Sequence, residues 1–145
     1  MTMGVKSIAH STNQIIDADL ISAYVIDSRM GRNYGEMRIW KNAMDLAVEI
    51  YHLVAKFPKS EQYGLAAQMR RAVVSISSNI AEGCAGTNLQ FKSHLRIALG
   101  SAYELHSQVL LCAEVGITSA ESTEELESDL LSLIKMMHSY HNRVE

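Results

Sequence analysis

The sequence predicts an all-α protein, an antiparallel up-down-up-down four-helix bundle that follows an N-terminal extension. Three observations lead to this fold class. Apolar residues recur at alternating spacings of three and four in four successive segments, which is the repeat of helices with one buried face. One proline and eight glycines in 145 residues are too few turn signals for a many-stranded protein. The connections are short, roughly three to eight residues, as between antiparallel neighbours in bundles.

Length and composition indicate one domain. Apolar residues make up 48% of the chain and charged residues 20%, which is typical of a globular protein large enough to bury its own core. Residues 1–34 show no sustained period, so we expect them to form an extension whose order the sequence does not define. Residues 35–145 are expected to form the bundle domain.

The first expected helix spans residues 39–57 and carries two adjacent apolar stripes. One stripe is Ile39, Ala43, Leu46, Ile50, Leu53 and Phe57, and the other is Trp40, Met44, Ala47, Tyr51 and Val54. One stripe suffices for a bundle core, so part of the second is expected to meet another chain or the N-terminal extension. The second helix is expected to begin near Ser60 and Glu61 and to end at Gly83 in a left-handed conformation.

The third and fourth helices repeat their apolar positions with the same rhythm. Thr87 or Asn88 can cap the third helix, and Gly116 should end it. Ser122 and Glu125 are expected to form a capping box for the fourth helix. The buried positions are expected to be Phe91, Leu95, Ala98, Ala102, Leu105, Val109 and Cys112 in the third helix, and Leu126, Leu130, Leu133, Met137, Tyr140 and Val144 in the fourth.

The charge balance limits the classes of partner. A net charge of −3 argues against a surface that attracts nucleic acid over its whole area, although a local basic patch stays possible. Neither a secretory signal nor a membrane-spanning helix is expected, because the apolar runs near the start are broken by aspartates. With two cysteines and no such signal, we expect a cytoplasmic protein without disulfides and without a membrane partner.

A polar stripe accompanies the apolar stripe of the second helix. Arg71, Ser75, Asn79 and Glu82 recur at helical spacing, and short Ser and Asn side chains suit a surface against which another element packs. If the second and third helices are antiparallel about a turn near residue 87, Arg71 faces Glu104, and Ser75 lies near Gly100 and Ser101.

From this stripe we expect an ion pair between Arg71 and Glu104, for which Arg70 could substitute for Arg71. Ser75, Asn79, Glu82 and Ser101 would complete a hydrogen-bonded network within the bundle or at a subunit boundary. The alternative interpretation is a site for a ligand or partner.

The sequence offers no catalytic arrangement. A di-metal carboxylate bundle needs Glu-x-x-His on two helices, and only Glu49 and His52 have that spacing, since Glu82 and Glu104 lack the histidine. Glycine-rich phosphate loops and recognisable nucleophile motifs are also missing. We therefore expect no catalytic residue, no cofactor and no metal.

The residues resemble a known family, the four-helix bundle proteins encoded within intervening sequences of bacterial 23S ribosomal RNA genes. The resemblance covers roughly residues 35–117 and is carried by Ile39-Trp40, Ala43, Leu46, Tyr51, Phe57-Pro58, Glu61, Gly64-Leu65, Gln68, Arg70-Arg71-Ala72, Ser75-Ile76, Asn79-Ile80-Ala81-Glu82-Gly83, Phe91, Leu95, Ala98, Gly100-Ser101 and Glu104-Leu105. It implies a cytoplasmic bundle that assembles into a ring, commonly a homopentamer, with no known catalytic activity.

A related branch, the accessory proteins of diversity-generating retroelements, is similar in fold and binds a reverse transcriptase and nucleic acid. This chain departs from that branch after the Glu82-Gly83 pair, where no positive charge occurs before Lys92. The basic residues most free to meet phosphate are Lys41, Lys56, Lys59, Lys92 and Arg96. In a ring, weak contacts repeated in every subunit would add up.

The sequence and the resemblance together predict a non-enzymatic, homo-oligomeric binding protein. The leading hypothesis is an accessory protein associated with RNA or with a reverse transcriptase. The competing hypothesis is a structural assembly whose acidic C-terminal region recruits a basic protein partner. A small enzyme built on the bundle is a distant third.

Overall fold

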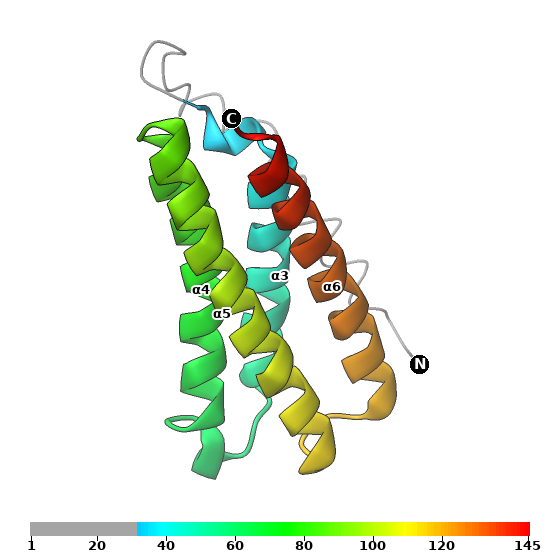
Figure 1. Ribbon diagram of the computed structural model, residues 1–145. Helices are drawn as coiled ribbons and strands as arrows, with labels where there is room; N and C mark the ends of the chain where they lie inside the picture. The colour runs from blue at the N-terminus through cyan, green and yellow to red at the C-terminus, as the bar shows by residue number, and fades with distance from the viewer. Residues whose placement is uncertain (1–31) are drawn as a thin grey trace.

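The computed structural model describes residues 32–145, in which helices joined by short turns make up all the regular structure and no strand occurs (Figure 1). Four long helices, α3 (Arg38–Val54), α4 (Leu65–Cys84), α5 (Asn88–Glu114) and α6 (Ala120–Arg143), run in alternating directions. Two short 3-10 helices, η2 (Tyr34–Glu36) and η3 (Lys59–Glu61), precede α3 and α4. The predicted four-helix bundle is confirmed. The predicted extension lies almost wholly outside the described residues.

One apolar core runs along the bundle and draws on all four helices. In α5 the seven positions expected from the sequence are all buried. In α6 the expected positions are buried as far as Met137, whereas Tyr140 and Val144 are partly buried against the core at the end of the bundle. The core forms because packing each apolar stripe inward removes it from water, at roughly 25 cal/mol per Å².

The second apolar stripe of α3 divides between the core and the surface. Val54 is fully buried, whereas the side chain of Tyr51 is 48% exposed. Trp40 meets the ring of Tyr34 edge-on, with ring centroids 5.1 Å apart. Part of the stripe is therefore covered by the segment just before α3, as expected.

Gly83 does not end its helix in a left-handed conformation, which corrects the prediction from sequence. It lies within α4, and the described glycine with a positive φ is Gly116. A Cβ atom added at Gly83 would lie 2.9 Å from the Cβ of His94 and 3.3 Å from the Cα of Phe91. This glycine is therefore required by the close approach of α4 to α5, and not by its backbone angles.

Both ends of α5 follow the predicted signals. Thr87 forms a capping box with Gln90 at the start of α5, and Gly116, with φ of 75°, follows the end of that helix. The predicted capping box of α6 is wrong. Ser119 is the N-cap residue and accepts a hydrogen bond from the backbone N–H of Ser122, so α6 begins at Ala120.

The start of the second long helix is also later than predicted. Ser60 and Glu61 belong to η3, and α4 begins at Leu65. Gly64 separates the two elements because its angles, φ −98° and ψ −112°, are not helical. Glu61 still serves the helix start, since its Oε2 accepts a hydrogen bond from the N–H of Leu65 at 3.4 Å.

Candidate functional site

Short polar side chains form a hydrogen-bonded network between α4 and α5. Ser101 of α5 donates a 2.8 Å hydrogen bond to the hydroxyl oxygen of Ser75 on α4. The amide nitrogen of Asn79 donates to the carbonyl oxygen of Ser75 at 2.8 Å and lies 3.2 Å from its hydroxyl. All three side chains are half-buried. The structure thus brings together three of the predicted network residues.

His94 joins this network and was not predicted. Its Nδ1 atom lies 3.1 Å from Oδ1 of Asn79 and 3.8 Å from the carboxylate of Glu82. The ring is about one-third exposed, at 31%. The antiparallel pairing that places Ser75 beside Ser101 also places Asn79 and Glu82 beside His94, so the facing positions of α5 could have revealed it. We call these five residues the polar network: Ser75, Asn79, Glu82, His94 and Ser101.

The predicted ion pair between Arg71 and Glu104 is not formed in residues 32–145. Both side chains are exposed, and Glu104 accepts a 3.1 Å hydrogen bond from Gln108 one turn along α5. The small serines occupy the line of contact between the helices, which leaves the longer charged side chains outside it.

Arg70 does not replace Arg71 in such a pair. It donates a 2.8 Å hydrogen bond to the backbone carbonyl of Gln62. The side chain of Gln62 in turn donates to the carbonyl of Val54 at 2.9 Å and to that of Phe57 at 3.0 Å. Arg70 therefore stabilises the connection between α3 and α4.

The geometry of the polar network does not suit nucleophilic catalysis. A serine nucleophile needs a base within hydrogen-bonding reach, but His94 bonds to Asn79, and the two serines bond to each other. Burial raises the pKa of Cys84 and of Cys112 to about 11, so both thiols are protonated at neutral pH. In residues 32–145, no group of three or more His, Cys, Asp or Glu side chains is placed to hold a metal ion.

The five predicted phosphate-contacting residues lie at two ends of the bundle. α3 and α5 begin at one end, where α4 and α6 finish (Figure 1). That end carries Arg38, Lys41, Lys92, Arg96 and Arg143, which we call the basic end, together with the acidic Glu36, Glu82 and Glu145. Lys56 and Lys59 follow the far end of α3, roughly 25 Å away at 1.5 Å per residue. The structure therefore separates these two lysines from the other three residues.

Large apolar side chains are exposed along α5, with one more, Val74, on α4, and the exposed Arg96 and Glu104 lie beside them in the sequence of α5. Val74 is 42% exposed, Ile97 51% and Leu111 48%, while Tyr103 and Leu110 are exposed at 51% and 40%. Gly100 lies on the same outer surface of α5, and a Cβ atom added there would meet nothing within 4 Å. We call this surface, with its glycine, the apolar face: Val74, Ile97, Gly100, Tyr103, Leu110 and Leu111.

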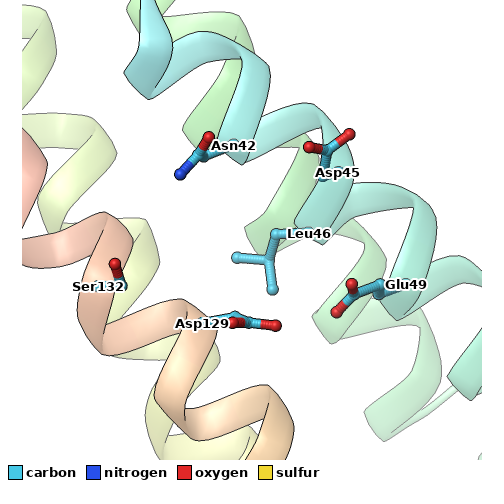
Figure 2. Close-up of a pocket in the computed structure, with 6 residues that line it drawn as sticks. All are labelled: Asn42, Asp45, Leu46, Glu49, Asp129 and Ser132. Carbon is cyan, nitrogen blue, oxygen red and sulfur yellow. The ribbon is translucent and has the colours of Figure 1, made fainter. Parts of the chain in front are cut away.

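An acidic groove lies between α3 and α6, and sequence reasoning missed it. Figure 2 shows the carboxylates of Glu49 and Asp129 pointing toward one another across a cavity of about 190 Å³, with Leu46 between them. Burial is the largest cause of a raised pKa at Glu49, and together with the negative charges of Asp129, Asp45 and Glu125 it brings that pKa to about 7. In the sequence, acids such as Glu125 and Asp129 indicate only the favourable start of a helix. Their position relative to α3 becomes visible only in the structure.

Comparison with known proteins identifies the family. The family described as 23S rRNA-intervening sequence protein matches residues 35–139. The chain belongs to this family. A solved structure described as a protein with unknown function from the S23 ribosomal protein family of Bacteroides thetaiotaomicron is 24% identical, with a TM-score of 0.67, over 72% of this chain and 95% of that one. At this identity the likeness shows the fold alone. A search of curated proteins finds no match.

Membership of the 23S rRNA-intervening sequence protein family confirms the resemblance inferred from the motifs. The matched region ends at residue 139, inside α6, although this helix continues to Arg143. Among the described helices, none combines the length and the apolar character needed to cross a membrane. The family description names 23S rRNA and an intervening sequence and does not name a reaction.

Proposed function

We propose that this protein is a non-catalytic, homo-oligomeric bundle that serves in the cytoplasm as an accessory protein for RNA or for a reverse transcriptase. The observation that carries the proposal is the apolar face, because it leaves large side chains in water around a helical glycine. A monomer gains nothing from this arrangement, since glycine within a helix costs about 1 kcal/mol relative to alanine.

A second copy of the chain explains the apolar face. Exposed Ile97 and Leu111 lie fourteen residues apart on α5, and Tyr103 and Leu110 repeat at seven. Ile97 and Leu111 flank Gly100, whose missing side chain lets another backbone approach closely. Burying these side chains between copies would remove apolar surface from water. The ring size that we propose, a pentamer, comes from the family resemblance.

A ring would turn the basic end into a multivalent surface. Cyclic symmetry about an axis parallel to the helices places the same end of every subunit on one face of the assembly. Lys41, Lys92 and Arg96 would then recur around that face and contact phosphates together. This repetition supports RNA binding by a chain whose net charge is −3.

The proposal is tested by light scattering and an RNA shift assay on the same sample. We expect several subunits per particle and an RNA affinity that falls steeply with added salt. A triple variant, Lys41→Gln with Lys92→Gln and Arg96→Gln, should weaken binding and flatten the salt dependence. Its matched control, Lys56→Gln with Lys59→Gln at the opposite end, should bind nearly as well as the parent. A monomeric particle would overturn the assembly.

The alternative function is a scaffold that recruits a basic protein partner and does not bind nucleic acid. The exposed acids Glu121, Glu124 and Glu125 near the start of α6 favour this alternative. Unchanged migration of RNA at low salt, in an assembled sample, would reject the leading proposal and support this one.

A further inference from the structure

The contact between α3 and α6 is less extensive than the contact between α5 and α6, and it has fewer hydrogen bonds between side chains. α5 and α6 are joined by a 2.8 Å hydrogen bond between His106 and Glu127 and by a 2.9 Å bond between Tyr103 and His138. Between α3 and α6, the described hydrogen bond runs from Asn42 to the sulfur of Met136, at 3.8 Å. α6 is therefore held to α5 more firmly than to α3.

We propose that the acidic groove makes the docking of α6 on α3 dependent on pH, with Glu49 as the group that binds the proton. Glu49 lies in this contact and lines both the 190 Å³ cavity and a neighbouring cavity of about 120 Å³. The inference concerns the fold of one subunit and does not depend on RNA binding or on assembly.

The charged groups that surround Glu49 are mostly negative. From α3 itself, Asp45 lines the same cavity, and from α6 Asp129 lines it as well (Figure 2). The neighbouring cavity is lined by Glu125 from α6 and by two basic groups, His52 and Lys56, from α3 and the residues after it. Neither α4 nor η2 contributes a residue to either cavity.

This arrangement favours the protonated form of Glu49. His52, Lys56, Asp129 and Glu125 are all exposed, so water weakens the effect of their charges, and the half-burial of Glu49 is the larger cause. An ionised Glu49 repels the carboxylates of α6 across the groove. A protonated Glu49 removes that repulsion and can donate a hydrogen bond to a carboxylate such as that of Asp129. The groove should therefore close as the pH falls and loosen as it rises.

The sign of the effect on stability follows from proton binding. Burial and the neighbouring carboxylates raise the pKa of Glu49 from its usual 4.5 to about 7 in the folded chain. The folded state therefore holds the proton more tightly than the unfolded state between these two values. Stability contributed by this group falls as the pH rises from about 4.5 to 7 and stays level above that range.

The test measures the urea midpoint of the full chain between pH 5 and pH 8, with the subunit number followed by light scattering. We expect the midpoint of the parent to fall across this range, and the fall to be smaller in Glu49→Gln. Glu104→Gln, which removes an exposed acid on α5, should keep the dependence of the parent. The histidines are unchanged in both variants, so the difference between parent and Glu49→Gln isolates Glu49.

A second measurement does not need any variant. In the parent, the side-chain carboxyl carbon of Glu49 can be assigned by through-bond NMR correlations and followed against pH. A midpoint near 7 supports the proposal. A midpoint near 4.5, or a Glu49→Gln variant with the full pH dependence of the parent, would overturn it.

Discussion

The same substitution, glycine to alanine, should have opposite effects on stability at Gly83 and at Gly100. Both glycines lie inside helices, and alanine is better than glycine in a helix interior by about 0.5 to 1 kcal/mol. Propensity alone therefore predicts that both variants gain stability. The surroundings of the two Cβ positions decide otherwise.

At Gly83 the added methyl group would collide with parts of the chain that cannot move aside. The Cβ atom would lie 2.9 Å from the Cβ of His94, 3.0 Å from the ring of Phe91 and 3.3 Å from the Cα of Phe91. Overpacking of this kind costs about 1 to 3 kcal/mol, and the rigid neighbours place it in the upper half of that range. After the gain in helix propensity, we expect Gly83→Ala to lose about 1 to 2 kcal/mol.

At Gly100 the methyl group would meet no atom within 4 Å in a single subunit. We expect Gly100→Ala to raise the unfolding free energy of the subunit by about 0.5 to 1 kcal/mol. If α5 meets another copy at this glycine, the same methyl group should weaken assembly. A stabilised subunit with reduced self-association is therefore the expected phenotype.

The assay is urea unfolding followed by circular dichroism, at a dilution at which light scattering reports single subunits. The linear extrapolation then gives the free energy of each variant. The reasoning about close packing is refuted if Gly83→Ala is as stable as the parent. The reasoning about the apolar face is refuted if Gly100→Ala assembles as strongly as the parent at higher concentration.

The remaining predictions concern the polar network, the acidic groove and the apolar face. Asn79→Ala should lower the free energy of unfolding by about 1 to 2 kcal/mol in urea, because it leaves half-buried hydrogen-bonding groups without a partner. Glu104→Gln on the surface should change it by under about 0.5 kcal/mol. Equal effects of the two variants would contradict the assignment of Asn79 to the polar network. Glu49→Gln should raise stability at pH 8 by about 1 to 3 kcal/mol and much less at pH 5, because solvent reduces the roughly 3.4 kcal/mol to which the full pKa difference corresponds. Ile97→Ser should lower the subunit number in light scattering while leaving the helical signal unchanged; an unaltered particle mass would count against the apolar face.

Local spacing determined most of the fold. We could predict the seven core positions of α5 because a helix repeats every 3.6 residues. We could also predict its start after Thr87 and its end before Gly116, because the ends of a helix depend on neighbouring groups. The pairing of Ser75 with Ser101 also followed, since antiparallel helices joined by a short turn have a fixed register.

The tertiary structure decided the features that depend on distance between helices. His94 enters the polar network, Arg71 stays outside it, and Gly83 is needed for close packing, because each depends on how closely α4 approaches α5. The pKa of Glu49 likewise depends on carboxylates of α6 that are about eighty residues away in the sequence. A sequence specifies which faces are apolar through local periodicity, but contact distances and electric fields arise only when those faces have packed together.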